Sequence, residues 1–378
     1  MKIVHIIVGL NVGGAELMLL RLINQQAKTN KNITNIVVSL TNIGDVGNQI
    51  KSLGISVYTL NLRSVFYIPV IFTQLYFLLR RLNPDIVQTW MYHSDFLGGL
   101  AARLSGCRRV IWGIRTTDIK FGGSFPTLLI RWFCARLSNV VPDAIICVGF
   151  KAKRLHESIG YQSNRMTVIP NGYDFSSLNI DAISTKSLRL ALGIKKGALI
   201  VGTLGRFNPV KDQLNFVRAA GLIAARNQNV QFIMVGRGCD YVNRELMSWI
   251  KATGYADRFQ LLGERQDTTV YLSIMDVFVL SSRTEGFPNA LVEAMAIERA
   301  CVSTMVGDVD RILGRCGIIV PPEDNEALAK GIDELLNVSC DQRIRYGCAA
   351  RKRVTERYSI HKCSDRYIEL YNNLMQKI

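Results

Sequence analysis

The sequence lacks several features that define whole classes of protein. Its nine cysteines include no CxxC pair and their number is odd, which argues against a disulfide framework and against a zinc knuckle. Only four histidines occur, and none has the spacing of a metal-ligand pair. No stretch reaches the roughly 18–20 apolar residues that a membrane-spanning helix needs. These absences are typical of a chain that folds in a reducing cytosol.

Two apolar segments come closest to an export or membrane signal. The apolar run in residues 1–14 is short and ends in glycines with no cleavage pattern behind it, so we interpret it as a buried strand. The segment 65–79 is interrupted by Pro69 and Gln74 and is followed by two arginines. A packed helix is the first interpretation of this segment, and a helix that dips into a membrane is the alternative.

The chain is basic, with a net charge of +16, and the charge is concentrated in its first half. Residues 1–180 hold 19 Lys and Arg against 8 Asp and Glu, whereas the rest holds 27 against 22. Such an excess implies an anionic partner, namely acidic lipid, nucleic acid or a phosphorylated substrate. Nucleic acid is disfavoured, because no helix-turn-helix, zinc or RNA-platform motif accompanies the charge. An anionic lipid surface, which attracts each nearby Lys or Arg by ~1 kcal/mol, is the better candidate.

Short apolar runs alternate with amphipathic stretches along the chain, as in parallel α/β sheets. The runs lie at 2–8, 34–40, 56–62, 85–90, 108–114, 143–149 and 166–172, and then at 198–205, 230–236, 258–263, 277–282, 300–306 and 316–322. A segment rich in Gly, Ser, Asp and Thr at 171–190 is interpreted as the linker between the two series. We expect two doubly wound α/β domains facing a central cleft, with ligands bound at the carboxyl ends of strands.

The loop at 202–213 has the composition of a phosphate site. A strand ends at Gly205, Arg206 and Lys211 follow, and a helix is expected to start near Asp212. Two cations beside glycine-freed backbone amides form a receptor for a diphosphate. The segment lacks the GxxxxGK[ST] pattern of a Walker loop. A surface loop with two solvated cations is the alternative interpretation.

The segment 283–295, RTEGFPNALVEAM, spaces two acids around a turn. Pro288 suits the first turn of a helix that contains Glu293, while Glu285 lies in the loop ahead. If the whole segment were helical, the two acids would be ~12 Å apart, too far for the paired carboxylates of a glycosidase. They suit the two ends of a long ligand, with the helix N-terminus offering amides to an anion between them. A first-turn acid and a solvated helix acid are the alternative.

Three further features carry weaker signals. Gly13 and Gly14, between the first strand and the first helix, allow a ligand to approach the backbone, although the spacing is not GxGxxG. Asp308 and Asp310 match the DxD metal motif of a different sugar-transferase architecture, but they lie among apolar residues and a metal role is disfavoured. His93 follows a strand and is expected to face the cleft, with a structural histidine as the equal alternative.

Together these motifs resemble glycosyltransferase family 4, the retaining enzymes with a GT-B fold. The markers are GGAE at 13–16, VIPNGYD at 168–174, GRFNPVK at 205–211, VGRG at 235–238 and EGFPNALVEAM at 285–295. The resemblance implies two Rossmann-like domains. One spans 1–175 and binds the acceptor, with the C-terminal helix 357–378 packing back on it, and the other spans 176–356 and binds the nucleotide sugar.

The resemblance also implies roles for individual residues. Arg206 and Lys211 would bind the donor's diphosphate next to Gly205, Glu293 the ribose, and Glu285 the donor sugar near its anomeric carbon. The remaining donor contacts implied by the resemblance are Gly13 and Gly14 at the transferred sugar, Leu262 and Arg265 at the base, and the main chain of Phe287, Pro288, Asn289, Ala290 and Leu291 at the phosphates. Neither a metal nor another cofactor is expected, because cations and helix amides stabilise the departing diphosphate.

The chain also departs from the family pattern. Arg115 stands where many relatives carry a histidine, so Arg115 and the nearby Asp118 are assigned to the acceptor side, and His93 is a candidate for the missing imidazole. Glu298 and Ala300 replace a usual glycine and proline, which is expected to loosen that helix end.

The basic first half leads us to expect a peripheral enzyme on the inner face of the cytoplasmic membrane. Its acceptor would be a polyprenyl-diphosphate-linked saccharide or a lipopolysaccharide precursor in surface-polysaccharide assembly. Two alternatives remain, namely a nucleotide-sugar epimerase or hydrolase on the same fold and a non-catalytic nucleotide-sugar-binding partner of another transferase.

Overall fold

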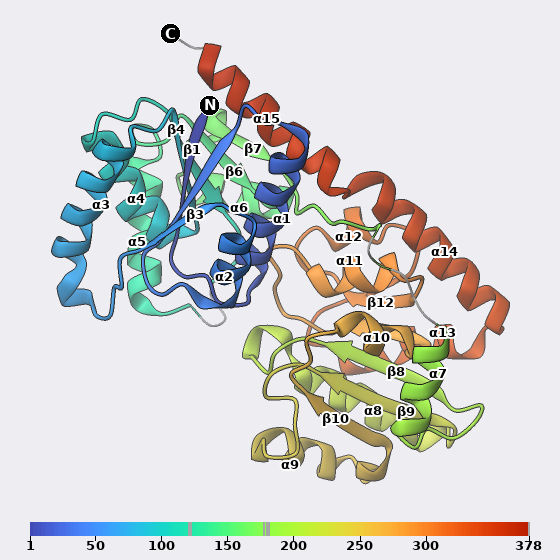
Figure 1. The fold of residues 1–378 in the computed structure, drawn as a ribbon. Coiled ribbons are helices and arrows are strands. Elements are labelled where there is room, and N and C mark those ends of the chain that lie inside the picture. Colours follow the sequence, from blue (N-terminus) through green and yellow to red (C-terminus); the bar gives the residue numbers. More distant parts are fainter. Residues whose placement is uncertain (120–122, 177, 179–181, 377–378) are drawn as a thin grey trace. The chain divides into compact units, whose positions relative to one another are not determined.

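The protein, described here from a computed structural model, consists of two compact units. The structure describes residues 1–119, 123–176, 178 and 182–376. The first unit comprises Met1–Asp174 together with Tyr358–Ile378, and the second comprises Phe175–Arg357. Figure 1 shows that each unit is built around its own sheet with helices on both faces. The sequence placed the domain boundaries at residues 175 and 356.

The sheet of the first unit has seven parallel strands in the order β3-β2-β1-β4-β5-β6-β7. The strands are β1 (Lys2–Ile7), β2 (Thr34–Ser39), β3 (Ser56–Thr59), β4 (Ile86–Trp90), β5 (Val110–Ile114), β6 (Ala144–Cys147) and β7 (Met166–Val168). Their continuous apolar sequences follow from burial on both faces, which a parallel sheet flanked by helices requires. The chain order reverses between β1 and β4, and this reversal is the switch point of the sheet.

Two separate sets of helices cover the faces of this sheet. One core cluster joins the sheet to α1 (Gly14–Thr29), α2 (Gly44–Ser52) and α15 (Ile360–Gln376). The other joins it to α3 (Ile68–Leu82), α4 (Tyr92–Leu104) and α5 (Phe125–Leu137). The unit is completed by α6 (Phe150–Ser158) and by the short 3-10 turns η1 (Val65–Tyr67) and η2 (Ser163–Arg165). Both faces of the sheet are therefore buried.

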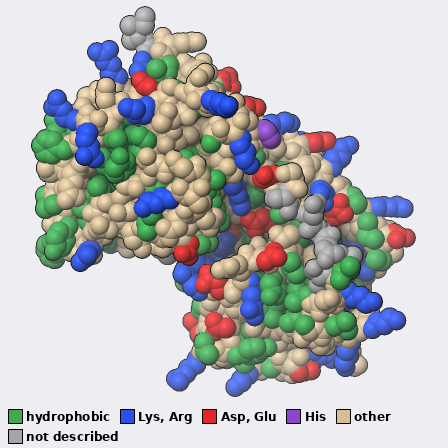
Figure 2. All heavy atoms as spheres, in the orientation of Figure 1, with side chains coloured by type: hydrophobic (Ala, Val, Ile, Leu, Met, Phe, Trp, Pro, Cys, Tyr) green, Lys and Arg blue, Asp and Glu red, His purple; other side chains and the backbone are tan. Residues whose placement is uncertain are grey.

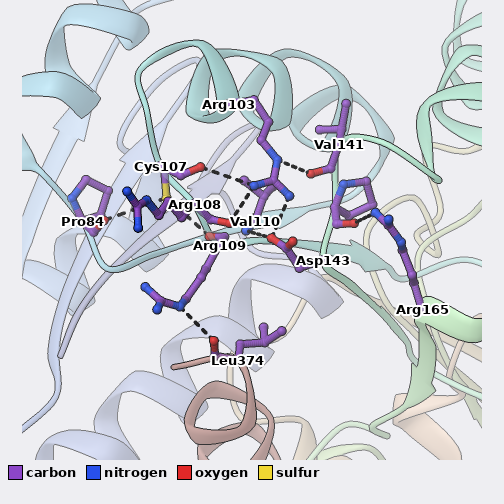
Figure 3. Close-up of polar contacts among 11 residues, drawn as sticks. Pro84, Arg103, Cys107, Arg108, Arg109, Val110, Val141, Asp143, Arg165 and Leu374 are labelled. Carbon is purple, nitrogen blue, oxygen red and sulfur yellow. Dashed lines mark hydrogen bonds and ion pairs between the residues drawn. The ribbon is translucent and has the colours of Figure 1, made fainter. Parts of the chain in front are cut away.

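The C-terminal helix α15 is an integral part of the first unit. Tyr367 and Tyr371 of this helix are fully buried in the cluster that contains α1. At the amino ends of the strands, Arg109 Nε donates to the carbonyl of Leu374 at 2.8 Å (Figure 3). The last helix is thus fixed by both apolar burial and a charge-assisted hydrogen bond.

Figure 3 also shows that several cations of the first unit serve internal contacts. Arg103 donates to the carbonyl of Val141 at 2.6 Å and to Asp143 Oδ2 at 2.7 Å, and Arg165 donates to the carbonyl of Pro142. These guanidinium groups satisfy carbonyls at the amino-terminal edge of the sheet. The positive charge of this unit is therefore only partly available to an external partner.

The sheet of the second unit has six parallel strands in the order β10-β9-β8-β11-β12-β13, with its switch point between β8 and β11. The strands are β8 (Leu199–Leu204), β9 (Val230–Val235), β10 (Phe259–Gly263), β11 (Val277–Leu280), β12 (Ala300–Thr304) and β13 (Ile318–Val320). The helical elements are α7 (Ala182–Ala191), η3 (Pro209–Lys211), α8 (Gln213–Arg226), α9 (Arg244–Ala252), η4 (Ala256–Arg258), α10 (Thr268–Ser273), α11 (Asn289–Ala296), α12 (Val309–Ile312), α13 (Asn325–Asn337) and α14 (Cys340–Arg357).

The structure corrects the expectation of a linker at 171–190. Its second half is helical, because α7 occupies Ala182–Ala191 and belongs to the second unit. Arg189 of this helix donates to the carbonyls of Ile274 and Ala198. The Ser and Thr residues within α7, which usually mark loops, hid an amphipathic helix. Residues 177 and 179–181 of the expected linker lie outside the described residues.

The segment 65–79, which the sequence left as either a packed helix or a helix that dips into a membrane, packs against the core along one side only. Ile71, Leu75, Leu78 and Leu79 of α3 are buried in the core of the first unit, whereas most other residues of the segment are partly or fully exposed. By length and composition, Val65–Leu82 is the one helical segment among the described residues that could cross a membrane, and 22% of it is buried. The helical segment is therefore longer than the apolar stretch 65–79 considered in the sequence, and it reaches the length of a membrane span.

Candidate functional site

The main candidate site lies at the switch point of the second sheet. The loop after β8 carries Arg206 and Lys211, and the loop after the neighbouring strand β11 carries Glu285. Because both strands are parallel, both loops leave the sheet at the same edge. The topology thus brings together two of the loops that the sequence singled out.

Lys211 and Glu285 form a close ion pair within this unit. Lys211 Nζ lies 2.6 Å from Glu285 Oε1, and the Ser282 hydroxyl donates to the same oxygen at 2.6 Å. Glu285 is buried and the Lys211 side chain is 23% exposed, so water screens the pair only in part. The sequence did not single out Ser282, which ends the strand run VFVLSS and fixes the carboxylate. A cation and a carboxylate are therefore held at one point of the sheet edge.

The helix that follows Glu285 begins one residue later than expected. Pro288 is the residue before α11 rather than part of its first turn, since its φ and ψ are −79° and 78°. Glu293 lies inside the helix and Glu285 in the preceding loop, as the sequence predicted. The estimate of ~12 Å between the two acids assumed one continuous helix. It does not apply to this loop–helix arrangement.

The amides at the start of α11 differ in their availability. Asn289 N–H donates to the carbonyl of Phe287 at 2.9 Å, and Leu291 N–H donates to that of Pro288 at 3.1 Å. Ala290 N–H makes no hydrogen bond within the described part of the chain. Among the amides of Asn289, Ala290 and Leu291, that of Ala290 is therefore the one left to donate to an anion.

Other predicted donor residues surround the same edge. Arg206 is exposed immediately after Gly205, whose backbone is so close to Gly236 that a side chain at Gly236 would collide with it. Leu262 lies near the end of β10, and the Arg265 guanidinium lies 5.7 Å from the ring centre of Tyr271. The loops after β8, β10 and β11 all emerge at the carboxyl edge of one sheet. Their roles toward a nucleotide and its sugar stay predictions.

The segment that contains Asp308 and Asp310 packs against the backbone of Glu285. Asp308 is buried and precedes α12, while Asp310 lies in the first turn of that helix. Gly307 has a φ of 48°, and a side chain there would meet the Glu285 carbonyl at 2.6 Å. Within the described residues, no three His, Cys, Asp or Glu side chains form a group able to hold a metal ion. This segment supports the loop that holds Glu285.

The first sheet presents a different set of residues at its own switch point. Gly13 precedes α1 and Gly14 begins it, after β1, whereas His93 lies in the first turn of α4, after the neighbouring strand β4. Between β4 and α4, Met91 has a φ of 72°, a strained value for a residue with a side chain. Partial burial lowers the pKa of His93, which favours the neutral imidazole.

Arg115, assigned to the acceptor side, is held by contacts within the first unit. Its guanidinium lies 4.3 Å from the ring centre of Trp90, and it donates to Asn171 Oδ1 at 3.1 Å and to the Tyr367 hydroxyl. These contacts join the loop after β5 to α15. Asp118 lies further along the same loop and is partly buried. The acceptor-side assignment of both residues stays a prediction, and a structural role for Arg115 is evident.

A buried carboxylate that the sequence did not reveal lies beside His93. Asp95 is fully buried in the first turn of α4, and its Oδ1 accepts hydrogen bonds from Thr89 Oγ1 at 2.5 Å and Gly113 N–H at 3.1 Å. Its Oδ2 is buried with no hydrogen-bond partner among the described residues. Burial raises the pKa of Asp95 to about 7. Only the three-dimensional neighbourhood could have revealed this group, because its sequence context is that of an ordinary helix start.

The family departure at Glu298 has a definite conformational consequence. Glu298 follows α11 with a φ of 63°, a left-handed conformation that glycine adopts without strain. Its carboxylate lies 3.7 Å from Arg351 of α14. The helix end is therefore strained rather than visibly loosened.

With this geometry in place, comparisons with known proteins decide the family. Residues 12–177 match the family model described as Glycosyltransferase Family 4, and residues 198–338 match the one described as Glycosyl transferases group 1. These two matches account for most of both units. The chain belongs to glycosyltransferase family 4. The sequence-based recognition is thus confirmed, and so is the predicted GT-B class with two Rossmann-like sheets.

Several individual proteins resemble this glycosyltransferase over most of their length. The Escherichia coli UDP-Gal:alpha-D-GlcNAc-diphosphoundecaprenol alpha-1,3-galactosyltransferase is 28% identical over 79% of each chain. The capsular polysaccharide biosynthesis glycosyltransferase CapM of Staphylococcus aureus is 24% identical over 78% of each chain. Among solved structures, Anabaena Alr3699/HepE in complex with UDP and glucose has a TM-score of 0.86, with 19% identity, 99% of this chain and 100% of that chain covered. This last likeness shows the fold.

Proposed function

We propose that this glycosyltransferase transfers a hexose from a nucleotide diphosphate sugar to a lipid-linked saccharide, with retention of the anomeric configuration. The observation that carries the proposal is the Lys211–Glu285 pair, which lies at the second switch point beside the start of α11. A cation for the diphosphate and an acceptor of hydrogen bonds for the sugar are thereby only 2.6 Å apart. In a donor, a single bond joins the sugar to the diphosphate, so the groups that bind these two parts need to lie close together.

In the proposed reaction, the bond between the anomeric carbon and the phosphate oxygen breaks, and its electron pair stays on the diphosphate. Lys211 and Arg206 neutralise the developing charge, with the Ala290 amide at the start of α11 as a further donor. The acceptor hydroxyl oxygen forms the new bond on the face from which the diphosphate leaves. Its proton passes to the departing phosphate, so that atoms and charge balance. This route uses neither a metal nor another cofactor.

Glu285 has a positioning role toward the sugar in this proposal. A carboxylate accepts hydrogen bonds and therefore suits sugar hydroxyls. Without a donor, Lys211 and Ser282 occupy Glu285 Oε1. A bound diphosphate would compete for Lys211, which frees Glu285 for the sugar. Glu293, inside α11, is proposed for the ribose.

The names of the relatives and the charge of the chain support the proposed acceptor and pathway. One relative is named for an acceptor on diphosphoundecaprenol and another for capsular polysaccharide biosynthesis. We infer that this protein acts in O-antigen, capsule or lipopolysaccharide assembly, at the inner face of the cytoplasmic membrane. Its partners would be a nucleotide sugar, a lipid-linked saccharide and an anionic membrane surface, without nucleic acid.

The decisive experiment analyses products with and without an acceptor. The purified protein is incubated with UDP- and GDP-hexoses, in the presence of EDTA, with and without a polyprenyl-diphosphate-linked saccharide. We expect transfer only with the acceptor, and an α-linked product from an α-linked donor when the anomeric coupling is measured by NMR. A β-linked product would contradict retention, and loss of transfer in EDTA would contradict metal independence.

The same incubation separates the two alternative functions. Release or isomerisation of the sugar at full speed without acceptor would indicate a hydrolase or an epimerase. Nucleotide-sugar binding in calorimetry without turnover on any acceptor would indicate a non-catalytic binding partner.

A further inference from the structure

One face of the first unit exposes an unusual number of large apolar side chains. Along η1 and the adjoining α3, the exposed fractions are Phe66 88%, Val65 71%, Phe77 62%, Tyr67 55% and Val70 51%. Figure 2 shows hydrophobic side chains gathered over the region that α3 occupies in Figure 1, with Lys and Arg around them. Isolated exposed apolar residues are normal, but a contiguous apolar patch marks an interaction surface.

A second helix on the same face has the same character. Only Cys134 and Ala135 of α5 are buried. Its exposed apolar side chains are Phe125 77%, Trp132 50%, Leu129 45%, Phe133 40% and Leu128 37%. Because α3 and α5 belong to one core cluster with α4, they cover the same side of the sheet. We call the exposed sides of η1, α3 and α5 together the α3/α5 face.

The charges on this face have one sign. Residues 46–84 and 119–142, which contain all three elements, include no Asp or Glu. The exposed cations among the described residues of η1, α3 and α5 and of the loops next to them are Arg63, Arg80, Arg81 and Arg136. Arg136 also lies over the Trp132 ring at 5.2 Å. Aromatic and aliphatic side chains with cations and without acids fit an anionic lipid surface, where rings enter the headgroup region and cations meet phosphates.

The core contacts of α3 determine how such a surface could be met. Ile71, Leu75, Leu78 and Leu79 are buried inside the first unit, so the helix cannot cross a bilayer without exposing that core. It can only lie along the membrane interface. An amphipathic helix in this position buries its apolar side about 5–10 Å into the headgroup and acyl boundary.

The face also adjoins the edge where the first switch point lies. A helix that follows a parallel strand starts at the carboxyl edge of the sheet. Phe66, in η1 after β3, and Phe125, at the start of α5 after β5, therefore lie at the edge that carries Gly13 and His93. The most exposed aromatic residues are at the end of the unit to which a membrane-anchored acceptor would come.

We propose that the α3/α5 face docks this protein on an anionic bilayer by partial insertion of Phe66, Phe77, Phe125 and Trp132. The biological purpose of this docking rests on the proposed lipid-linked acceptor, whose saccharide it would bring to the carboxyl edge of the first sheet. The docking itself depends only on the residues of this face.

Vesicle binding without donor or acceptor tests the docking directly. The full chain is sedimented with phosphatidylcholine vesicles that contain or lack phosphatidylglycerol. We expect binding to the anionic vesicles, and the double variant F66S/F125S should bind them at least tenfold more weakly, because two phenyl rings no longer leave water. The matched control V242S/I344S removes apolar side chains of the second unit that are 85% and 53% exposed, and it should bind as the wild type does.

Fluorescence distinguishes insertion from electrostatic adsorption. Of the four tryptophans, Trp132 is half exposed, Trp90 and Trp112 are fully buried, and Trp249 is partly buried in α9 of the second unit and is not part of this face. On anionic vesicles the emission should shift to shorter wavelength and keep most of this shift in 0.5 M salt, and Trp132→Phe should abolish it. An unshifted spectrum, wild-type binding by F66S/F125S, or no binding by the wild-type chain would each overturn the proposal.

Two further measurements separate this inference from its competitors. A dimer in sedimentation velocity that F66S/F125S converts to monomer would assign the face to a second copy of the chain and overturn the lipid assignment. F66S/F125S should transfer sugar to a short-chain, water-soluble acceptor at the wild-type rate. Its rate of transfer to the same saccharide on a lipid in vesicles should be at least tenfold lower than that of the wild type. If the wild type binds vesicles but transfers to neither acceptor, the proposed function fails while the docking face stands.

Discussion

In each sheet, a buried carboxylate follows the later strand of the pair that flanks the switch point, which is β4 in the first unit and β11 in the second. The two carboxylates have different electrostatic surroundings. In the first unit this is Asp95 after β4, with one oxygen buried and without a hydrogen-bond partner among the described residues. In the second unit it is Glu285 after β11, which pairs with Lys211 at 2.6 Å. The same topological position thus holds, in the first unit, a lone acid whose hydrogen bonds come from neutral groups and, in the second, an ion pair.

The difference indicates that the two sheets suit different ligands. The edge with Arg206, the Lys211–Glu285 pair and the start of α11 carries cations and backbone amides, which suit the proposed diphosphate. The edge with Gly13, Gly14 and His93 presents small or neutral groups, which suit the close approach of a sugar. A doubly wound sheet fixes where the loops lie, and the residues in the loops decide what they bind.

The largest effect is expected from the lone acid of the first unit. The pKa of Asp95 is raised to about 7 by burial, against an ordinary value of 3.8. Its stabilising contribution is therefore complete below pH 3.8 and is lost progressively as the pH rises from 3.8 through 7, by roughly 4 kcal/mol. Asp95→Asn, which does not titrate, should remove this dependence.

The measurement is the free energy of unfolding in urea between pH 4 and 8, compared between the wild type and Asp95→Asn. The pH slope matters here, because the amide that this substitution introduces would change the hydrogen bonds at all pH values. His5 and His156, whose burial lowers the pKa of each to about 4, titrate equally in both proteins and cancel. Parallel curves would show that Asp95 is ionised in the folded chain.

The ion pair of the second unit is tested by Lys211→Ala. Removal of a cation that stabilises the departing diphosphate should lower kcat/KM about a hundredfold, or ~2.7 kcal/mol. Lys196→Ala, at an exposed lysine of the same unit, is the matched control and should leave turnover unchanged. An activity of Lys211→Ala within threefold of the wild type would contradict the phosphate role and weaken the contrast between the two edges.

Arg115 and Arg206 offer an arginine comparison between the units. Arg115 contacts Trp90, Asn171 and Tyr367, so Arg115→Ala should cost about 2 kcal/mol of stability in urea unfolding. Arg206 is exposed, and Arg206→Ala should change stability by less than ~0.5 kcal/mol. Unchanged stability of Arg115→Ala with a raised KM for the acceptor would instead support its acceptor-side assignment.

The smallest effect concerns two helix ends. Asn83 follows α3 with a φ of 44°, and Glu298 follows α11 with a φ of 63°. Asparagine tolerates this conformation better than glutamate, so the strain lies in the second unit. Glu298→Gly should raise the free energy of unfolding by about 0.5 kcal/mol, after loss of the part-exposed contact to Arg351. Asn83→Gly should raise the free energy of unfolding by less. An equal increase in the two variants would remove the contrast between the two helix ends.

The sequence predicted much of this molecule correctly, because its strands are long apolar runs with little ambiguity. All thirteen strands of the structure fall within the predicted runs. The loop position of Glu285 and the helical position of Glu293 were also correct, because a Gly-Phe-Pro sequence interrupts regular structure between them. The helix α7 was missed because Ser and Thr, which usually mark loops, occur within it.

Other features could not follow from local sequence. The lone Asp95, the hydroxyl of Ser282 on Glu285 and the stacking of Arg115 on Trp90 depend on neighbours that come from other strands and loops. The burial that raises the pKa of Asp95 is a property of the packed core, and no spacing of residues encodes it.

The sequence by itself thus determined the two series of strands, the family motifs and the positions of the cations that are proposed to bind phosphate. The tertiary structure decided which of these groups meet. Parallel strands bring the loops after β8 and β11 to one edge, where Lys211 reaches Glu285. Packing also decided which side of α3 is buried and which side stays exposed. Distances and burial arise only when separate segments share one core, and they set the electrostatic energies on which the proposed chemistry depends.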